Sequence, residues 1–219
     1  MLGLGLGVPA VAARRRGAGG GGGEPSGPTE NYLNPSDKGA NITLTNSNRT
    51  LQKSGFGYES VRSIDFRTSG KFYLEVEFTA ATTGSSAAAG FGTSAASLTQ
   101  APGANNLSIR LSKDGLYRHS SNQGGTAMTA IANGARIGFA LDLDNRKIWF
   151  RSAAGVWNPS AAGTQNPETN AGGFTFPATF TGDIYAMHGV QTTADFMTVS
   201  YHTSEFLTAA PSGFEKFQI

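Results

Sequence analysis

Two pairs of carboxylates have the clearest potential for acid–base chemistry in this chain. Asp142 and Asp144 are two positions apart, as are Glu75 and Glu77, so each pair would point to one face of a strand. Such pairs can transfer protons or hold a calcium ion. However, Asp142 and Asp144 lead directly into a predicted hairpin turn, where aspartate is common. A structural role is therefore the favoured prediction, and a glycan-processing enzyme is a remote alternative.

The other residue types that perform catalysis or bind metals lack the necessary patterns. The three histidines, His119, His188 and His202, have none of the spacings of a zinc site. The chain has no cysteine, which excludes disulfides and thiol mechanisms. It also contains neither a Gly-x-Ser-x-Gly elbow nor the Gly-Lys-Ser/Thr ending of a P-loop. We therefore predict a protein that is not an enzyme and that uses no metal and no cofactor.

Six side chains in two short segments are suited to recognition instead. They are Tyr117, Arg118, His119 and Asn122 in the first segment, and Trp157 and Asn158 in the second. Aromatic faces stack on sugars and are enriched at protein interfaces, while guanidinium and amide groups donate hydrogen bonds. We predict that these residues form a binding surface on loops for a host glycan or a surface protein. An equally weighted alternative is that Trp157 covers the edge of the fold.

Residues 1–30 differ from the rest of the chain in composition. Four apolar residues alternate with glycine or lie just beyond it, and three arginines follow: Leu2, Leu4, Leu6, Val8, Arg14, Arg15 and Arg16. An extended segment of this kind can lay its side chains into a groove while its backbone approaches closely. We predict a partner anchor followed by a Gly-rich linker. The alternative is an isolated disordered tail, although such tails are usually polar.

The distribution of charge and hydropathy limits the possible partners. The formal net charge is +2, and the residues after the arm carry nearly balanced charge. The sequence therefore does not predict the broad basic surface of a nucleic-acid-binding protein. No apolar run approaches the roughly 18 residues of a membrane-spanning helix, so no membrane span is predicted.

Alternating apolar and polar residues predict the strands that position these groups. The clearest case is a hairpin over 136–151, in which Ile137, Phe139 and Leu141 share one face. Residues 71–79 have a second apolar face, with Tyr73 and Glu75 expected outward. The other predicted strands are 41–45, 61–66, 87–93, 107–111, 116–119, 184–190 and 196–201. Short strands between Gly, Asn and Ser turns favour an all-β fold of two antiparallel sheets.

This hairpin and three other segments resemble the SPRY domain in its bacteriophage structural-protein variant. The three segments are Asn34–Thr45, Ser69–Phe78 with its Gly-Lys-Phe-Tyr-Leu-Glu-Val order, and Pro211–Lys216 with its Pro-Ser-Gly-Phe order. The resemblance implies a SPRY/concanavalin-like β-sandwich over residues 31–219, preceded by the extended Gly-rich arm of residues 1–30. It also implies that Trp157 occupies a loop that often covers the sandwich edge in this family.

The same resemblance implies a structural protein of the mature phage particle. In this interpretation the arm docks the chain onto other virion proteins, and the sandwich faces outward to bind a host surface or a protein, as part of a tail, fibre or collar. We expect a homo-oligomer or many copies per particle. The alternative is a capsid decoration protein that stabilises the shell without recognising a host.

Overall fold

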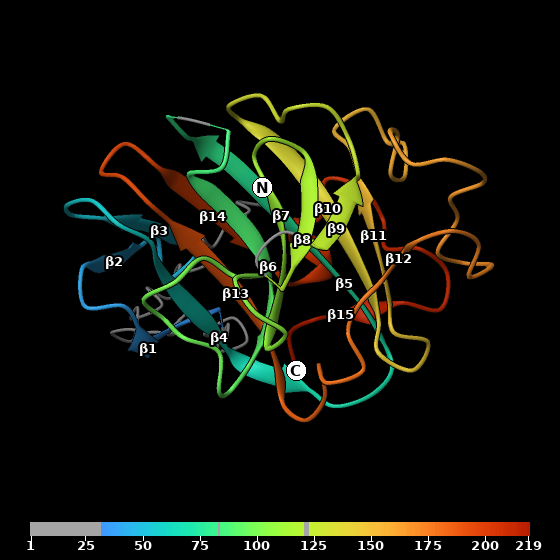
Figure 1. The fold of residues 1–219 in the computed structure, drawn as a ribbon, viewed down its shortest axis with the longest axis horizontal. Helices are drawn as coiled ribbons and strands as arrows, with labels where there is room; N and C mark the ends of the chain where they lie inside the picture. Colours follow the sequence, from blue (N-terminus) through green and yellow to red (C-terminus); the bar gives the residue numbers. More distant parts are fainter. Residues whose placement is uncertain (1–31, 83, 121–122) are drawn as a thin grey trace, which may run out of the picture.

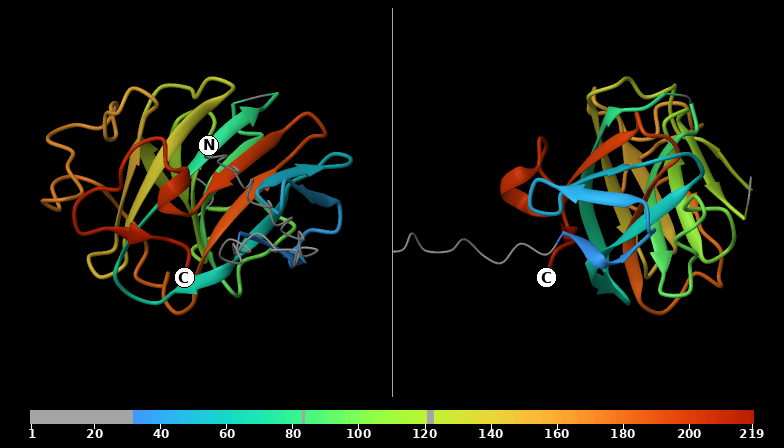
Figure 2. Two further views of the ribbon diagram at one scale, coloured as in Figure 1. Left: turned by 180° about the vertical axis from the view of Figure 1, so that it is seen from behind. Right: turned by 90° about the vertical axis from the view of Figure 1, so that its left-hand side faces the viewer.

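Two β-sheets packed face to face form the structure, a computed structural model that describes residues 32–82, 84–120 and 123–219 (Figure 1). The view turned by 90° in Figure 2 shows the strands arranged as two layers. One short 3-10 helix, η1 (Thr203–Glu205), is the only helix among these residues. The predicted all-β, two-sheet sandwich is confirmed. The predicted arm, residues 1–30, lies outside the described residues.

The first sheet has seven strands, and all its pairings are antiparallel. In spatial order they are β1 (Leu33–Lys38), β4 (Glu59–Arg67), β13 (Ile184–Val190), β6 (Ala87–Thr93), β7 (Ser108–Ser112), β8 (Leu116–His119) and β9 (Gln123–Thr126). Its central strands, β13 and β6, contain small residues such as Ala88, Gly90 and Gly92, all buried. The alternate residues Ala87, Ala89 and Phe91 belong to the core between the sheets, so Ala88, Gly90 and Gly92 are on the outer face, where a Cβ on Gly92 would lie 2.4 Å from the Met187 sulfur.

The second sheet has eight strands and contains the predicted hairpin. In spatial order they are β12 (Phe174–Thr175), β11 (Lys147–Arg151), β10 (Ala135–Asp142), β5 (Lys71–Ala80), β14 (Phe196–Ser200), β3 (Thr50–Lys53) and β2 (Ile42–Thr45). The short strand β15 (Glu215–Lys216) pairs in parallel with β5. Hairpin β10–β11 is in register from Gly138–Arg151 to Asp142–Lys147.

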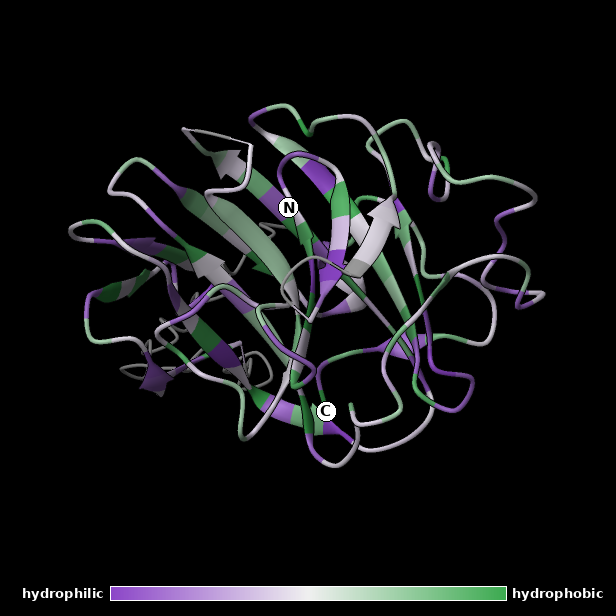
Figure 3. Ribbon diagram, viewed as in Figure 1, coloured by the Kyte–Doolittle hydropathy of each residue, from purple (hydrophilic) through white to green (hydrophobic). Residues whose placement is uncertain are grey.

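The core lies between the sheets and is rich in aromatic rings. The apolar faces predicted for β5 and β10 are confirmed, since Leu74, Val76, Phe139 and Leu141 are fully buried. Phe139 and Phe150 make an edge-to-face contact with ring centroids 5.3 Å apart. In Figure 3 the hydrophobic residues concentrate on the central strands, and hydrophilic residues are frequent in the loops.

The outer face of the second sheet is also covered, which the alternating pattern did not predict. Tyr73 and Glu75, expected to point outward into solvent, are buried. Tyr73, Ala140, Trp149 and Phe214 form a second apolar cluster on this face. The segment after β14 packs over this cluster. Strands β5, β10 and β11 therefore carry buried side chains on both faces.

Every predicted strand is present, but several short strands were not predicted. The missed strands are β1, β3, β9, β12 and β15. They have between two and six residues, and β9, with the sequence Gln-Gly-Gly-Thr, contains no large apolar side chain. Their pairing depends on neighbouring strands rather than on their own side chains, so hydrophobic alternation could not reveal them.

Candidate functional site

The carboxylates near the hairpin turn have structural roles, as predicted. Asp142 is fully buried, and its two oxygens accept hydrogen bonds from the backbone N–H and side-chain amide of Asn145, at 2.9 and 2.8 Å. Lys71 forms an ion pair with Asp142 at 3.2 Å. Asp144 accepts a hydrogen bond from the backbone of Gly70 at 2.9 Å. These bonds tie the hairpin turn to the beginning of β5.

The two carboxylates of the second pair, Glu75 and Glu77, share an arginine partner but differ in burial. The buried carboxylate of Glu75 accepts hydrogen bonds from the backbone N–H groups of Leu207 and Thr208, at 2.7 and 3.1 Å, and from the Tyr73 hydroxyl at 2.8 Å. Arg136 pairs with both carboxylates, at 3.7 Å from Glu75 and 3.6 Å from Glu77. The space beside Glu75 has a volume of only about 10 Å³, about enough for one water molecule. Glu75 therefore fastens the segment over the outer sheet face and has no room for a substrate.

Tyr117, which was predicted to bind a ligand, is a core residue instead. It lies in β8, its side chain is only 2% exposed, and its ring packs against Phe150 and Phe174 in the core. Burial raises the pKa of its hydroxyl well above the ordinary value. This ring cannot stack on a ligand, because Phe150 and Phe174 of the other sheet already pack against it.

The neighbours of Tyr117 do not form a common recognition surface either. Arg118 donates to Asp114 at 2.7 Å and to the Ser112 hydroxyl at 3.0 Å, so its charge is already paired. His119 is half-buried, and burial lowers its pKa. Asn122 lies outside the described residues. Arg118 and His119 thus do not combine with the buried Tyr117 into one exposed binding surface.

Trp157 and Asn158 serve the structure of their own loop. The Trp157 ring packs on the Arg151 guanidinium, 5.0 Å from its centroid, and belongs to the outer cluster with Tyr73. Asn158 is fully buried, accepts a hydrogen bond from the Phe150 N–H at 2.8 Å and donates one to Gln165 at 2.8 Å. Trp157 thus covers the sheet, the alternative weighed above. The prediction of Asn158 as a ligand contact is wrong because its side chain is fully buried and bonded within the fold.

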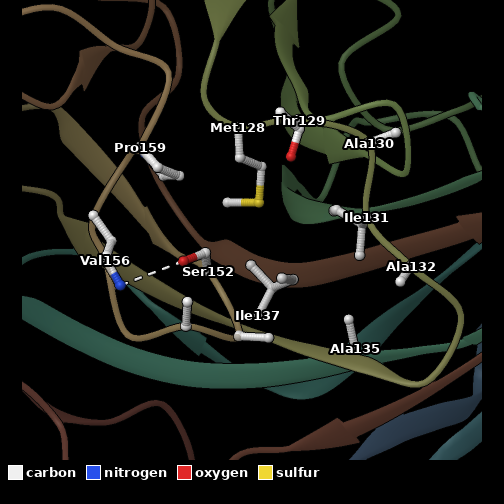
Figure 4. A pocket seen from close by; sticks show the side chains of 12 residues that line it. Met128, Thr129, Ala130, Ile131, Ala132, Ala135, Ile137, Ser152, Val156 and Pro159 are labelled. Carbon is white, nitrogen blue, oxygen red and sulfur yellow. Dashed lines mark hydrogen bonds between the residues drawn. The ribbon is translucent and has the colours of Figure 1, made fainter.

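The structure places an apolar pocket directly beside Trp157. It lies between the β9–β10 connection and the loop after β11, with a volume of about 340 Å³. Figure 4 shows side chains from both loops and from β10 pointing into it. Its floor consists of the buried Met128, Ile131 and Ile137. Its rim consists of exposed residues, among them Val156, which is 52% exposed, and Pro159. We call this the loop-end pocket.

Backbone hydrogen bonds hold the two walls of the loop-end pocket in place. Ser160 N–H donates to the carbonyl of Ala127 at 3.0 Å and so joins the two loops directly. Ile131 N–H donates to Lys113 at 2.7 Å. Within the second loop, the Ser152 hydroxyl accepts a hydrogen bond from Val156 N–H at 3.3 Å, also drawn in Figure 4. These hydrogen bonds fix the two walls of the pocket relative to each other.

A glycine under the first wall is required for this arrangement. Gly115 has a φ of +81°, and an added Cβ would lie 2.1 Å from the carbonyl oxygen of Met128. Only glycine permits both the left-handed backbone and the close approach. Gly115 also accepts hydrogen bonds from the N–H groups of Ala127 and Met128 at 3.0 and 3.2 Å. The turn between β7 and β8 thus fixes the position of Met128.

The lining of the pocket determines what it can bind. Its side chains are aliphatic or thioether groups apart from the hydroxyls of Thr129 and Ser152, and none is ionisable. An apolar group gains by leaving water for such a surface, whereas a sugar would leave its hydroxyls without hydrogen bonds. Among the described residues, no group of three or more acidic or histidine side chains is placed to hold a metal ion. The pocket therefore suits an apolar side chain.

The sequence contained a weak signal for this pocket. Residues 127–135 and 152–159 have the small and aliphatic side chains of the walls, but the hairpin separates them in sequence. They read as loops because neither has strand alternation. Only the pairing of β10 with β11 and the hydrogen bond between Ser160 and Ala127 bring the two loops together.

Comparisons with known proteins identify the fold. The SPRY domain of human HERC1 aligns with a TM-score of 0.57 and 14% identity, covering 76% of this chain and 96% of that domain. The TRIM65 PSpry domain aligns with a TM-score of 0.54 and 14% identity, covering 79% of this chain and 93% of that one. No protein-family model and no curated protein matches the sequence. The chain therefore has a SPRY-like β-sandwich fold, as predicted, and identities this low define the fold alone. Within the described residues, no helix is long and apolar enough to cross a membrane.

Proposed function

We propose that this chain is a structural protein of a bacteriophage particle whose sandwich is a protein-binding module. The observation that carries the binding role is the preformed loop-end pocket, open at an exposed rim and free of ionisable side chains. Pockets of this kind are the usual sites of recognition, and apolar anchors dominate protein interfaces. The SPRY-like fold supports the same role, because the SPRY domains that share it are typically protein-interaction modules.

The sequence analysis allowed either a host glycan or a protein as the ligand, and the lining of the pocket favours a protein. A host glycan was one expected ligand, but the lining offers only two hydroxyl side chains for hydrogen bonds. A protein partner that inserts an aliphatic or aromatic side chain fits the lining better. We therefore favour a protein ligand and a binding role without catalysis.

The phage setting is supported by the sequence segments that resemble phage structural proteins. In this proposal, residues 1–30 dock the chain onto other virion proteins, and the protein resides in the mature particle. The segments Asn34–Thr45 and Ser69–Phe78, on which the resemblance rests, form β1, β2 and β5 of the sandwich. Their role in the fold explains why they are the recognisable parts of the chain.

A charge placed at the pocket rim tests the proposal. Val156→Asp puts a carboxylate on an exposed rim residue and should leave the sandwich folded while weakening binding of an apolar group. Ile64→Asp, at a 39% exposed position on β4 in the other sheet, is the matched control. In particles carrying each variant, we would measure copy number, adsorption to host cells and thermal stability of the particle.

Each readout assigns a different role. Loss of adsorption with normal copy number, for Val156→Asp only, supports recognition of a host protein. Loss of particle stability alone supports the capsid decoration alternative. If Val156→Asp and Ile64→Asp behave like the parent in all three measurements, the pocket is not a binding site and the proposal fails.

A further inference from the structure

One aromatic side chain is more exposed to solvent than any other large hydrophobic side chain in the described residues. Phe56, in the connection between β3 and β4, is 86% exposed, the highest value among the large hydrophobic side chains described. The flanking Gly55 and Gly57 have φ values of +87° and +94°, and nothing lies within 4 Å of a Cβ built on either. The loop therefore projects into solvent with the Phe56 ring at its tip.

A buried ion pair at the base of this loop, Lys53 with Glu59, binds its backbone. Lys53 is 4% exposed, and its ammonium donates hydrogen bonds to the carbonyls of Phe56 and Gly57, at 3.5 and 2.6 Å. Glu59 balances the charge at 3.4 Å and accepts a hydrogen bond from the Asn41 backbone at 2.7 Å. Burying a lysine is costly unless it is paired and hydrogen-bonded. These contacts hold the backbone that follows the tip, and a hydrogen bond from Ser54 N–H to the Asn41 carbonyl at 3.1 Å holds the backbone before it, so the base of the Phe56 loop is fixed on both sides.

An exposed phenylalanine on a supported loop is well suited to insert into a partner. Isolated apolar side chains are common on surfaces, but an aromatic ring on a fixed backbone loses little conformational entropy on binding. Aromatic residues of this kind are the typical anchors of protein interfaces. The Phe56 loop thus has the properties of the inserting half of an interface.

The loop-end pocket has the properties of the receiving half. Its volume of about 340 Å³ accommodates a benzyl group, and its aliphatic floor and lack of ionisable side chains match an uncharged ring. The two halves cannot meet within one molecule. β3 and β10 are separated by β14 and β5 in the second sheet, so about 14 Å of sheet lies between them.

We infer that Phe56 of one copy inserts into the loop-end pocket of a second copy. This inference rests on the proposed role of the pocket as a protein-binding site and names the partner. Because the inserting and receiving surfaces differ, each copy can use both at once, and the contact joins copies head to tail. Repetition of this contact gives a ring if it closes and a filament if it does not.

The head-to-tail geometry allows a complementation experiment with the full chain. Sedimentation velocity would be measured from roughly 1 μM to about 1 mM, the range in which small interfaces associate. The parent should form species larger than a dimer as concentration rises. Phe56→Ser and Val156→Asp should each reduce association at least tenfold, because each removes one half of the contact. Ile64→Ser, on β4, is the control and should associate like the parent.

Mixing the two defective variants gives the decisive result. The Phe56→Ser protein keeps an intact pocket and the Val156→Asp protein keeps an intact Phe56, so an equimolar mixture should form dimers and nothing larger. Absence of dimers in the mixture, or self-association of the parent that neither substitution weakens, would overturn the inference. A parent that stays monomeric throughout would also overturn it, while leaving the particle measurements above to decide whether the pocket binds another protein.

Discussion

The buried histidine of the first sheet should make the sandwich sensitive to acid. His188 is fully buried on β13, and its Nε2 is 2.6 Å from the Tyr201 hydroxyl. Burial lowers the pKa of His188 from 6.5 to about 3. In the unfolded chain the ring is in water and takes up a proton near pH 6.5. The folded state therefore loses stability as the pH falls below 6.5, and the loss continues until about pH 3.

The size of this effect follows from the two pKa values. Each pH unit between them contributes about 1.36 kcal/mol, so the whole interval corresponds to about 5 kcal/mol. Between pH 7 and pH 4.5 the expected loss from His188 alone is about 2.5 kcal/mol. That is a large part of the roughly 5–15 kcal/mol by which folded domains are stable.

Urea denaturation of the parent and of His188→Gln at several pH values measures this term. The glutamine amide can still bond to Tyr201 but does not titrate, so the difference in unfolding free energy between parent and variant should shrink as the pH falls. Other groups cancel in this difference. Asp195 is one of them: burial raises its pKa, but hydrogen bonds from Thr82, Thr192 and Ser86 outweigh this and lower it. Its contribution is lost only as the pH falls through that lowered value.

Tyr201→Phe separates burial from hydrogen bonding. It removes the hydroxyl but keeps the ring, so stability should fall by about 1–3 kcal/mol while the dependence on pH is retained. Parallel curves of free energy against pH for the parent and His188→Gln would refute the reasoning, because they would mean that His188 takes up its proton as readily in the folded state as in the unfolded state.

Three further predictions concern stability and assembly. Phe139→Ala should lower the unfolding free energy by about 3–5 kcal/mol, and Tyr117→Ala should do the same because its ring is also part of the core, both measured by urea denaturation. Asp142→Asn should cost about 1–3 kcal/mol by leaving Lys71 without its partner. A melting temperature that rises on adding calcium in the parent but not in this variant would contradict the structural role of Asp142. Deletion of residues 1–23 should leave the urea midpoint unchanged but abolish incorporation into particles, and normal copy number of the truncated chain would disprove the anchor.

The sequence predicted a strand correctly where its apolar side chains all point to one face. The apolar faces of β5 and β10 were predictable because alternate side chains point into one core. Tyr73 and Glu75 were misplaced because their burial depends on the segment around Leu207 and Thr208, which is more than 130 positions away and has no pattern of its own. A period of two cannot indicate that both faces of a strand are covered.

The binding surface was harder to predict for a related reason. Tyr117, Trp157 and Asn158 were selected by residue type, but a tyrosine can anchor a core as well as an interface. The loop-end pocket is made of alanine, valine, isoleucine and proline side chains that have no distinctive chemistry in sequence. Its concave shape arises from the positions of two loops, and no local pattern encodes that. Phe56 was equally unremarkable in sequence, since its exposure depends on the buried Lys53 beneath it.

The order of strands in the two sheets has a consequence for how the protein acquires its structure. β4 lies between β1 and β13, and β5 lies between β10 and β14, so these early strands pair with strands more than a hundred residues later in the chain. During synthesis they would leave the ribosome with apolar faces and unpaired edges long before β13 and β14 exist. Folding should therefore be slow and should occur late, after most of the chain has been made. In that interval the nascent chain is most exposed to aggregation and most dependent on chaperones.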